Sequence, residues 1–151
     1  MSLFLILLAA GDSKRFKSNI PMPFNMVNNK TLLEHSLDAF KDFSAIKKTI
    51  IVYNKKHKKY LDKLNLKNTV TIVGGQTRQE STFKALKKIK RMNCKKVLIH
   101  DAARPFPSKK IINEIINNLK RNHAVVPIIK INDATNVLKK ILFLKIFNVI
   151  A

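Results

Sequence analysis

Hydrophobic and polar residues alternate in blocks along the chain. Short apolar runs rich in Leu, Ile and Val are separated by longer segments with helical spacing. Unbroken apolar runs are typical of strands buried on both faces, as in a parallel sheet. We expect strands at residues 3–9, 48–53, 70–73, 97–99 and 124–129 and helices at residues 31–43, 56–64, 79–92 and 108–119.

Local signals support three of these helices. Thr31 and Glu34 have capping-box spacing, and Ser108 is expected to cap the last helix. The expected core-facing stripes are Leu32, Leu33, Leu37 and Phe40 in the first helix, Phe83, Leu86 and Ile89 in the third, and Ile112, Ile115, Ile116 and Leu119 in the last.

Repeated strand–helix units predict an α/β fold. We expect a three-layer, Rossmann-like, mostly parallel sheet with helices on both faces, as in nucleotide-diphospho-sugar transferases. The 151 residues fit one domain, residues 1–151. Residues 137–151 form an apolar run punctuated by lysine, which fits a final strand, a helix or a tail.

The formal charge of +21 changes this picture little. Lysine, asparagine and isoleucine recur together along the whole chain, which indicates a general compositional bias more than a dedicated binding patch. Nucleic-acid-binding proteins usually cluster arginine and aromatic residues on one face. The charge still predicts attraction of anionic ligands and nonspecific, salt-sensitive binding of nucleic acid.

Cysteine usage and hydropathy predict a cytoplasmic protein. Cys94 is the single cysteine, so no internal disulfide is possible. The apolar run that begins at Leu3 lacks a positive flank and is too short to span a bilayer, so we expect a buried first strand and no membrane partner. The scattered histidines lack zinc-ligand spacing.

Three polar segments each follow an expected strand. They are Ala-Ala-Gly-Asp-Ser-Lys-Arg at residues 9–15, Gly-Gly-Gln-Thr-Arg-Gln-Glu-Ser at residues 74–81 and His-Asp-Ala-Ala-Arg-Pro at residues 100–105. Small residues allow backbone amides to approach a phosphate, and arginine binds phosphate bidentately. Taken singly, each also fits an ordinary turn or a surface ion pair. On one edge of a parallel sheet, the three would form a single crevice.

These segments resemble the motifs of the 2-C-methyl-D-erythritol 4-phosphate cytidylyltransferase family. That family carries Ala-Ala-Gly-x-Gly-x-Arg, Pro-Lys-Gln, Gly-Gly-x-x-Arg-x-x-Ser and His-Asp-Ala-Ala-Arg-Pro in this order. The agreement extends from Leu3 to about Thr135, and the last block is complete. The resemblance implies that the phosphate of methylerythritol phosphate attacks the α-phosphorus of CTP and that pyrophosphate leaves. Such catalysis relies on positioning and charge neutralisation.

The resemblance also assigns roles to individual residues. Arg15 would stabilise the triphosphate during catalysis, and Asp101 would lie at the ribose and bind Mg²⁺, the implied cofactor. Arg104 would bind the sugar-alcohol phosphate, in this family often across a homodimer interface. The implied nucleotide-binding residues are Ala9, Ala10, Gly11, Gly74, Gly75, Ser81, Asp101 and Ala102.

The chain departs from the family pattern at several positions. Met22 occupies the place of the Pro-Lys-Gln lysine, and methionine cannot neutralise phosphate. Ser13 replaces the second glycine of the first loop, and Asp133-Ala134-Thr135 only approximates an Asp-Thr pair, so Thr135 receives no role. The dimerisation arm and a late lysine-bearing segment have no counterpart. We therefore expect a C-terminally truncated member with weak CTP binding and little or no turnover.

Two alternatives remain open at this point. A ribitol-5-phosphate cytidylyltransferase is a close relative, although such enzymes tend to vary the block that is intact at residues 100–105. A non-enzymatic, basic nucleic-acid-binding module is the alternative from another class, and it predicts a steep dependence of affinity on salt.

Overall fold

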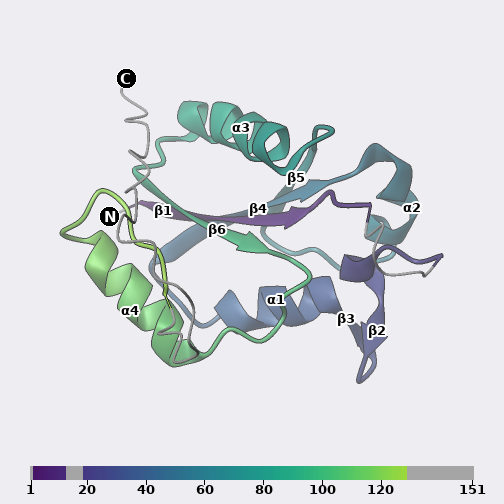
Figure 1. Cartoon of the computed structure of the whole chain (residues 1–151), viewed down its shortest axis with the longest axis horizontal. Helices are drawn as coiled ribbons and strands as arrows, with labels where there is room; N and C mark the ends of the chain where they lie inside the picture. The colour runs from purple at the N-terminus through teal and green to yellow at the C-terminus, as the bar shows by residue number, and fades with distance from the viewer. Residues whose placement is uncertain (1, 13–18, 129–151) are drawn as a thin grey trace, which may run out of the picture.

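The computed structural model describes residues 2–12 and 19–128 (Figure 1). Several of the helices and strands begin or end a few residues away from the expected positions. In chain order the elements are β1 (Leu3–Ala9), the 3-10 helix η1 (Met22–Phe24), β2 (Met26–Val27), β3 (Lys30–Thr31), α1 (Leu32–Phe40), β4 (Ile46–Tyr53), η2 (Lys55–His57), α2 (Lys58–Leu61), β5 (Thr69–Val73), α3 (Arg78–Ile89), η3 (Lys90–Met92), β6 (Lys96–Asp101) and α4 (Lys109–Leu119).

The main sheet is parallel throughout, as the apolar runs predict. Its four strands have the order β5-β4-β1-β6. From β1 the chain builds outward through β4 and β5, and it then crosses back through α3 to place β6 on the other side of β1. Such a change of direction opens a crevice at the carboxyl ends of the strands, where ligands of α/β sheets bind.

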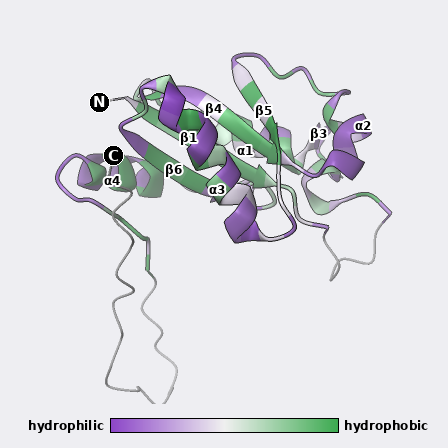
Figure 2. Cartoon of the chain, turned by 90° about the horizontal axis from the view of Figure 1, so that it is seen from above, coloured by the Kyte–Doolittle hydropathy of each residue, from purple (hydrophilic) through white to green (hydrophobic). Residues whose placement is uncertain are grey.

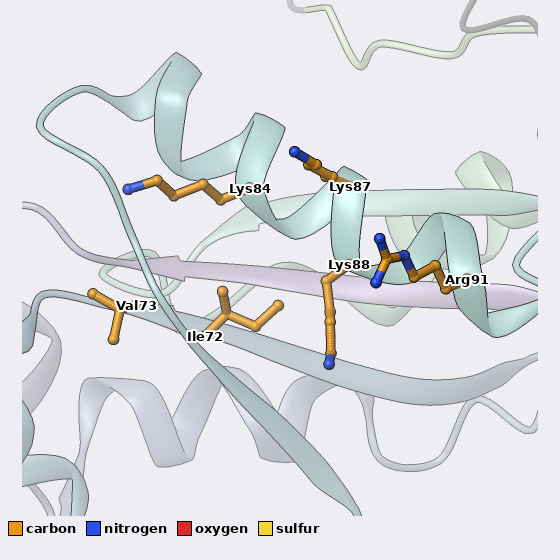
Figure 3. Close-up of a pocket in the computed structure, with 6 residues that line it drawn as sticks. All are labelled: Ile72, Val73, Lys84, Lys87, Lys88 and Arg91. Carbon is orange, nitrogen blue, oxygen red and sulfur yellow. The ribbon is translucent and has the colours of Figure 1, made fainter.

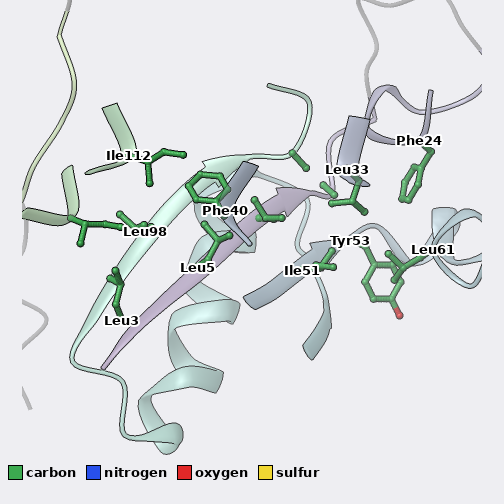
Figure 4. Close-up of a cluster of buried hydrophobic side chains, with 14 of the residues drawn as sticks. Leu3, Leu5, Phe24, Leu33, Phe40, Ile51, Tyr53, Leu61, Leu98 and Ile112 are labelled. Atoms are coloured by element: carbon green, nitrogen blue, oxygen red, sulfur yellow. The ribbon is translucent and has the colours of Figure 1, made fainter. Parts of the chain in front are cut away.

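Helices cover both faces of the sheet, which confirms the expected three-layer fold. Alternate side chains of β1 divide between two clusters, because successive residues of a strand point to opposite faces. Leu3 and Leu5 pack with Phe40 of α1 and with α4 (Figure 4). On the other face, Ile6 packs with Ile89 of α3. In Figure 2 the strands of the sheet are coloured largely as hydrophobic, whereas the helices carry many hydrophilic residues.

The predicted helix caps are present. The Thr31 hydroxyl accepts from the Glu34 backbone, and the Glu34 carboxylate accepts from Thr31, which completes the capping box of α1. Ser108 accepts from the backbone N–H of Ile111 at the start of α4. The β2–β3 hairpin was not expected; it turns through two asparagines with positive φ, as a tight hairpin turn requires.

The structure corrects two expectations. Phe83 is 65% exposed, and the face of α3 toward the sheet instead carries Ser81, Ala85 and Ile89. The strand expected at residues 124–129 is absent from its described part, residues 124–128, where Pro127 removes an N–H that a strand would need. The expectations for residues 137–151 lie outside the described residues.

Candidate functional site

The three polar segments lie at one edge of the sheet. They follow β1, β5 and β6, and all three strands run parallel, so their carboxyl ends meet at the same side. The register pairs Leu8 with Asp101 and Ala9 with Tyr53, which aligns the ends of β1, β6 and β4. This confirms the expected convergence of the described parts of the three segments.

The first and second loops are in direct contact through Gly74. A Cβ atom built at this glycine would lie 2.7 Å from Ala10 Cβ and 2.8 Å from Ser81 Oγ. Both distances are shorter than van der Waals contact allows, so the packing requires glycine. The Gly74 N–H also donates to the carbonyl of Tyr53 at the end of β4, 2.8 Å away. Three predicted nucleotide-binding residues are thereby packed against one another.

The loop after β5 is held by the first turn of α3. The Gly75 N–H donates to Ser81 Oγ at 3.0 Å, and the Gln76 N–H donates to Glu80 Oε2 at 2.8 Å. The backbone N–H of Gln76 and the ammonium of Lys84 lower the pKa of the Glu80 carboxyl, which therefore remains ionised. These contacts give the loop a defined shape without a ligand.

The first loop is buried at its start and open at its centre. Ala9 is fully buried, whereas Gly11 is exposed, and a Cβ at Gly11 would meet no atom within 4 Å. Neither packing nor a positive φ therefore requires glycine at this position. The open space fits a ligand that approaches the backbone. Arg15 lies outside the described residues.

Asp101, the last residue of β6, lies between two arginines. Its Oδ1 is 3.1 Å from both Nε and Nη2 of Arg78, and its Oδ2 is 3.5 Å from Nε of Arg104. The Arg78 and Arg104 side chains are 63% and 79% exposed. One carboxylate with two guanidiniums leaves this edge of the sheet with positive charge, which attracts phosphates.

The turn after Asp101 is fixed by hydrogen bonds. Ala102 is fully buried; its N–H donates to the Leu8 carbonyl at 3.0 Å, and its carbonyl accepts from Ser36 Oγ at 2.9 Å. Direct contact between Ala102 and a nucleotide would require this turn to open. His100 Nε2 donates to the Arg104 carbonyl at 2.7 Å, which fixes the backbone that carries the Arg104 guanidinium.

Besides the packing of Gly74 on Ala10, a second contact holds the first loop, and it was not predicted from the sequence. Asn54 Nδ2 donates to Asp12 Oδ1 at 2.7 Å, and His57 Nε2 lies 4.0 Å from the same oxygen. Burial lowers the pKa of His57, against the opposing effect of Asp12. Asp12, Arg78 and His100 all stand within the three motifs, but their spacing in the sequence does not indicate these partners.

Met22 begins η1, beside a small aromatic cluster. Phe24 of η1 is buried and stacks on Tyr60 at a ring-centroid distance of 5.5 Å. The half-buried Met22 therefore lies in a segment anchored to the sheet by its own hydrophobic contacts. The position is ordered but carries no cation.

The described side chains do not form a protein-held magnesium site. Residues 2–12 and 19–128 contain no group of three or more His, Cys, Asp or Glu side chains placed to hold a metal. Both carboxylate oxygens of Asp101 face guanidiniums. This donor set does not fit a resident ion. It fits only an Mg²⁺ ion whose ligands are mainly phosphate oxygens and water, as Mg²⁺ prefers in nucleotide complexes.

A separate hollow lies between β5 and the helical segment of α3 and η3 (Figure 3). It is lined by Ile72, Val73, Lys84, Lys87, Lys88 and Arg91, and its volume is about 290 Å³. None of the predicted site residues lines it. Within residues 2–12 and 19–128, no helix has the length and apolar character to cross a membrane.

Comparison with known proteins agrees with the motifs. The sequence model that describes the 2-C-methyl-D-erythritol 4-phosphate cytidylyltransferase family matches residues 3–143 of this chain. The bifunctional enzyme IspD/IspF of Pelagibacter ubique is 50% identical over 133 residues, which cover 88% of this chain and 36% of that protein. The cytidylyltransferase of Clostridioides difficile is 33% identical over 138 residues, which cover 88% of this chain and 58% of that protein.

A solved structure shows the same relationship. The bifunctional IspDF of Campylobacter jejuni superimposes with a TM-score of 0.68 at 33% identity, over 79% of this chain and 31% of that one. The chain thus spans less than two thirds of the length of these relatives. These similarities favour the family indicated by the motifs over the ribitol-phosphate relative and over a nucleic-acid-binding module.

Proposed function

The chain belongs to the 2-C-methyl-D-erythritol 4-phosphate cytidylyltransferase family, and from that premise we propose that it binds CTP and serves cytidylyl transfer to methylerythritol phosphate. A phosphate oxygen of the sugar alcohol would attack the α-phosphorus of CTP as the bond to pyrophosphate breaks. The contact of Gly74 with Ala10 and Ser81 carries the proposal, because it joins two motifs into one site.

We assign the cytosine to the loop after β5. Gly75 and Ser81 form its ordered turn, and Gly74 allows that turn to approach the first loop closely. Backbone groups on such a turn can recognise the edge of a base while excluding larger bases. The triphosphate would then lie along Ala10 and Gly11, where the backbone is open.

The loop after β6 would hold the ribose and the second substrate. Asp101 would accept from a ribose hydroxyl, and Arg104, which is largely exposed, would bind the phosphate of the sugar alcohol. Mg²⁺ would enter with the CTP phosphates as part of the substrate. If Asp101 contacts that ion, as the family resemblance implies, Oδ2 is the more accessible oxygen, because Arg104 Nε lies 3.5 Å from it while Arg78 bonds to Oδ1.

Turnover should be slow because a cation is missing at Met22. Arg15 is the proposed catalytic residue, and its family partner is a lysine at the Met22 position. Loss of one preorganised donor of this kind lowers the rate by roughly 10²–10³. Binding of CTP, which uses the loop backbones, should persist.

We further propose that the protein is cytoplasmic. The free Cys94 thiol is half-buried, and burial raises its pKa, which suits a reduced, unreactive cysteine. Its Sγ donates to the carbonyl of Lys96.

Two assays test the proposed function. Calorimetric titration with CTP and Mg²⁺ should show saturable binding that is stronger than binding of UTP or ATP, and Gly11→Ala should weaken it. Pyrophosphate release should require methylerythritol phosphate and should not occur with ribitol 5-phosphate. Equal affinity for all nucleotides and for DNA, falling steeply with salt, would contradict the proposal and support the nucleic-acid-binding alternative.

A further inference from the structure

Arg78 has no role in the family-based assignments above, yet it makes a close contact at the candidate site. It is the first residue of α3 and follows the loop at residues 74–77. Its Nε and Nη2 both lie 3.1 Å from Oδ1 of Asp101, at the end of β6. The two residues are 23 positions apart in the sequence. The contact therefore belongs to the fold and not to a local turn.

The Arg78–Asp101 pair links the two outer strands of the sheet. β5 and β6 are separated by β4 and β1, which corresponds to about 14 Å at the usual spacing of strands. The loop after β5 narrows this gap, because Gly74 bonds to the end of β4 and packs on Ala10. In the register of the sheet Asp101 pairs with Leu8, two residues before Ala10, so the ion pair joins the two loops that flank the first loop, the proposed binding place of the triphosphate.

The position of Arg78 in α3 is unfavourable for stability alone. The amino-terminal end of a helix carries partial positive charge and favours acidic residues, as Glu80 in the same turn illustrates. A guanidinium at the first helical residue adds to that charge. The arginine is held there by Asp101, and its side chain remains 63% exposed. The guanidinium and the helix end thus both contribute positive charge here, which Asp101 offsets in part.

Arg78 also retains hydrogen-bonding capacity. A guanidinium has five N–H donors in a planar fork, and the contacts of Nε and Nη2 with Asp101 use two of them. The Arg104 side chain approaches the other oxygen of the same carboxylate. Asp101 therefore holds two guanidiniums side by side with donors left for phosphate oxygens.

We propose that Arg78 is a further substrate-binding residue, whose guanidinium, oriented by Asp101 beside the first loop, binds the phosphate chain of the nucleotide. This inference rests on the proposed CTP site and adds to it a cation from α3. It predicts that the contribution of Arg78 depends on the phosphates and not on the base or ribose.

The test compares CTP with cytidine on the whole chain by calorimetry. Arg78→Gln should lower the affinity for CTP about tenfold or more, since it removes a charge-assisted contact, and should leave the affinity for cytidine unchanged. Arg78→Lys should give an intermediate loss, because lysine keeps the charge but not the planar fork. Arg91→Gln removes a cation from the far end of the same helical segment and should leave both affinities unchanged.

Two other outcomes for the Arg78 variants overturn the inference. If Arg78→Gln binds CTP as the unmodified chain does, or loses CTP and cytidine affinity equally, the residue has at most a structural role. If Arg78→Gln does not fold, the Arg78→Lys variant decides, and unchanged CTP affinity in it contradicts the proposal. If the unmodified chain binds no CTP, the proposed function itself fails, which is a separate result.

Discussion

The backbone N–H of Gly75 donates to the hydroxyl of Ser81, 3.0 Å away, and Ser81 is 3% exposed. This bond connects the loop after β5 to the first turn of α3. It stands close to the first loop, because Gly74 packs against both Ser81 and Ala10. A single buried hydroxyl therefore shapes the turn to which we assign the cytosine.

Replacing Ser81 by alanine should weaken both stability and binding. The Gly75 N–H would lose its acceptor, which costs about 1 kcal/mol in the free energy of unfolding, measured by denaturant titration. CTP affinity should fall as well, because the turn is less defined. Ser108→Ala serves as the control: it removes the cap of α4 at a similar cost in stability and should leave CTP affinity unchanged. Equal affinity in both variants would refute the assignment.

Replacing a glycine in each of the two loops by alanine should distinguish a glycine needed for packing from one needed for ligand binding. Gly74→Ala should destabilise the fold by about 1–3 kcal/mol, since its Cβ would overlap Ala10 and Ser81. Gly11→Ala meets no atom within 4 Å and should leave stability unchanged while it lowers CTP affinity. Thermal unfolding and calorimetry on both variants check this. A Gly11→Ala variant with full affinity would show that no ligand approaches this backbone.

A lysine at position 22 should raise catalytic rate. Met22 stands where the family has a phosphate-neutralising lysine, and restoring one such cation is worth up to roughly 10²–10³ in turnover. Pyrophosphate release by Met22→Lys should exceed that of the unmodified chain at least tenfold. Met22→Gln, which is similar in length but uncharged, should give no gain. The same rate in all three proteins would argue against a role for this position.

The free energy of unfolding should decrease as the pH is lowered, and part of this decrease should come from His57. Burial holds its pKa below 6.5 in the folded chain, so the unfolded chain takes up the proton first. The free energy of unfolding should therefore be constant with respect to His57 above pH 6.5 and decrease as the pH falls below it. Denaturant titrations of His57→Gln should show a shallower decrease, whereas exposed His123→Gln should match the unmodified chain. Identical slopes would contradict this account.

The strands and helix starts are predictable because their causes are local. An apolar run such as that of β1 has one stable place, the centre of a parallel sheet, and the Thr31–Glu34 box specifies a helix start by short-range hydrogen bonds. The meeting of three motifs then follows from parallel topology alone. The identity of the family follows from the order of those motifs.

Other features depend on three-dimensional packing. Helical spacing places Phe83 near Leu86, but the buried face of α3 carries Ser81, Ala85 and Ile89, and Ser81 packs directly against Gly74. Phe83 is consequently exposed. The apolar composition of residues 124–128 indicates a strand, yet Pro127 interrupts its hydrogen bonding.

The ion pair between Arg78 and Asp101 illustrates a further limit. Both residues stand in recognisable motifs, but nothing in their separation of 23 positions indicates contact. The pairing depends on how α3 crosses the sheet from β5 to β6. The tether from Asn54 to Asp12 likewise depends on the adjacency of β1 and β4.

The central claim is that the loops after β1, β5 and β6 form one CTP site. It is tested most directly by following backbone amide resonances of the labelled chain during titration with CTP and Mg²⁺. We predict that the amides of Gly11, Gly75 and Ala103 shift together and saturate with one dissociation constant. Shifts confined to lysine-rich surfaces such as α2, or separate saturation of the three loops, would contradict the claim.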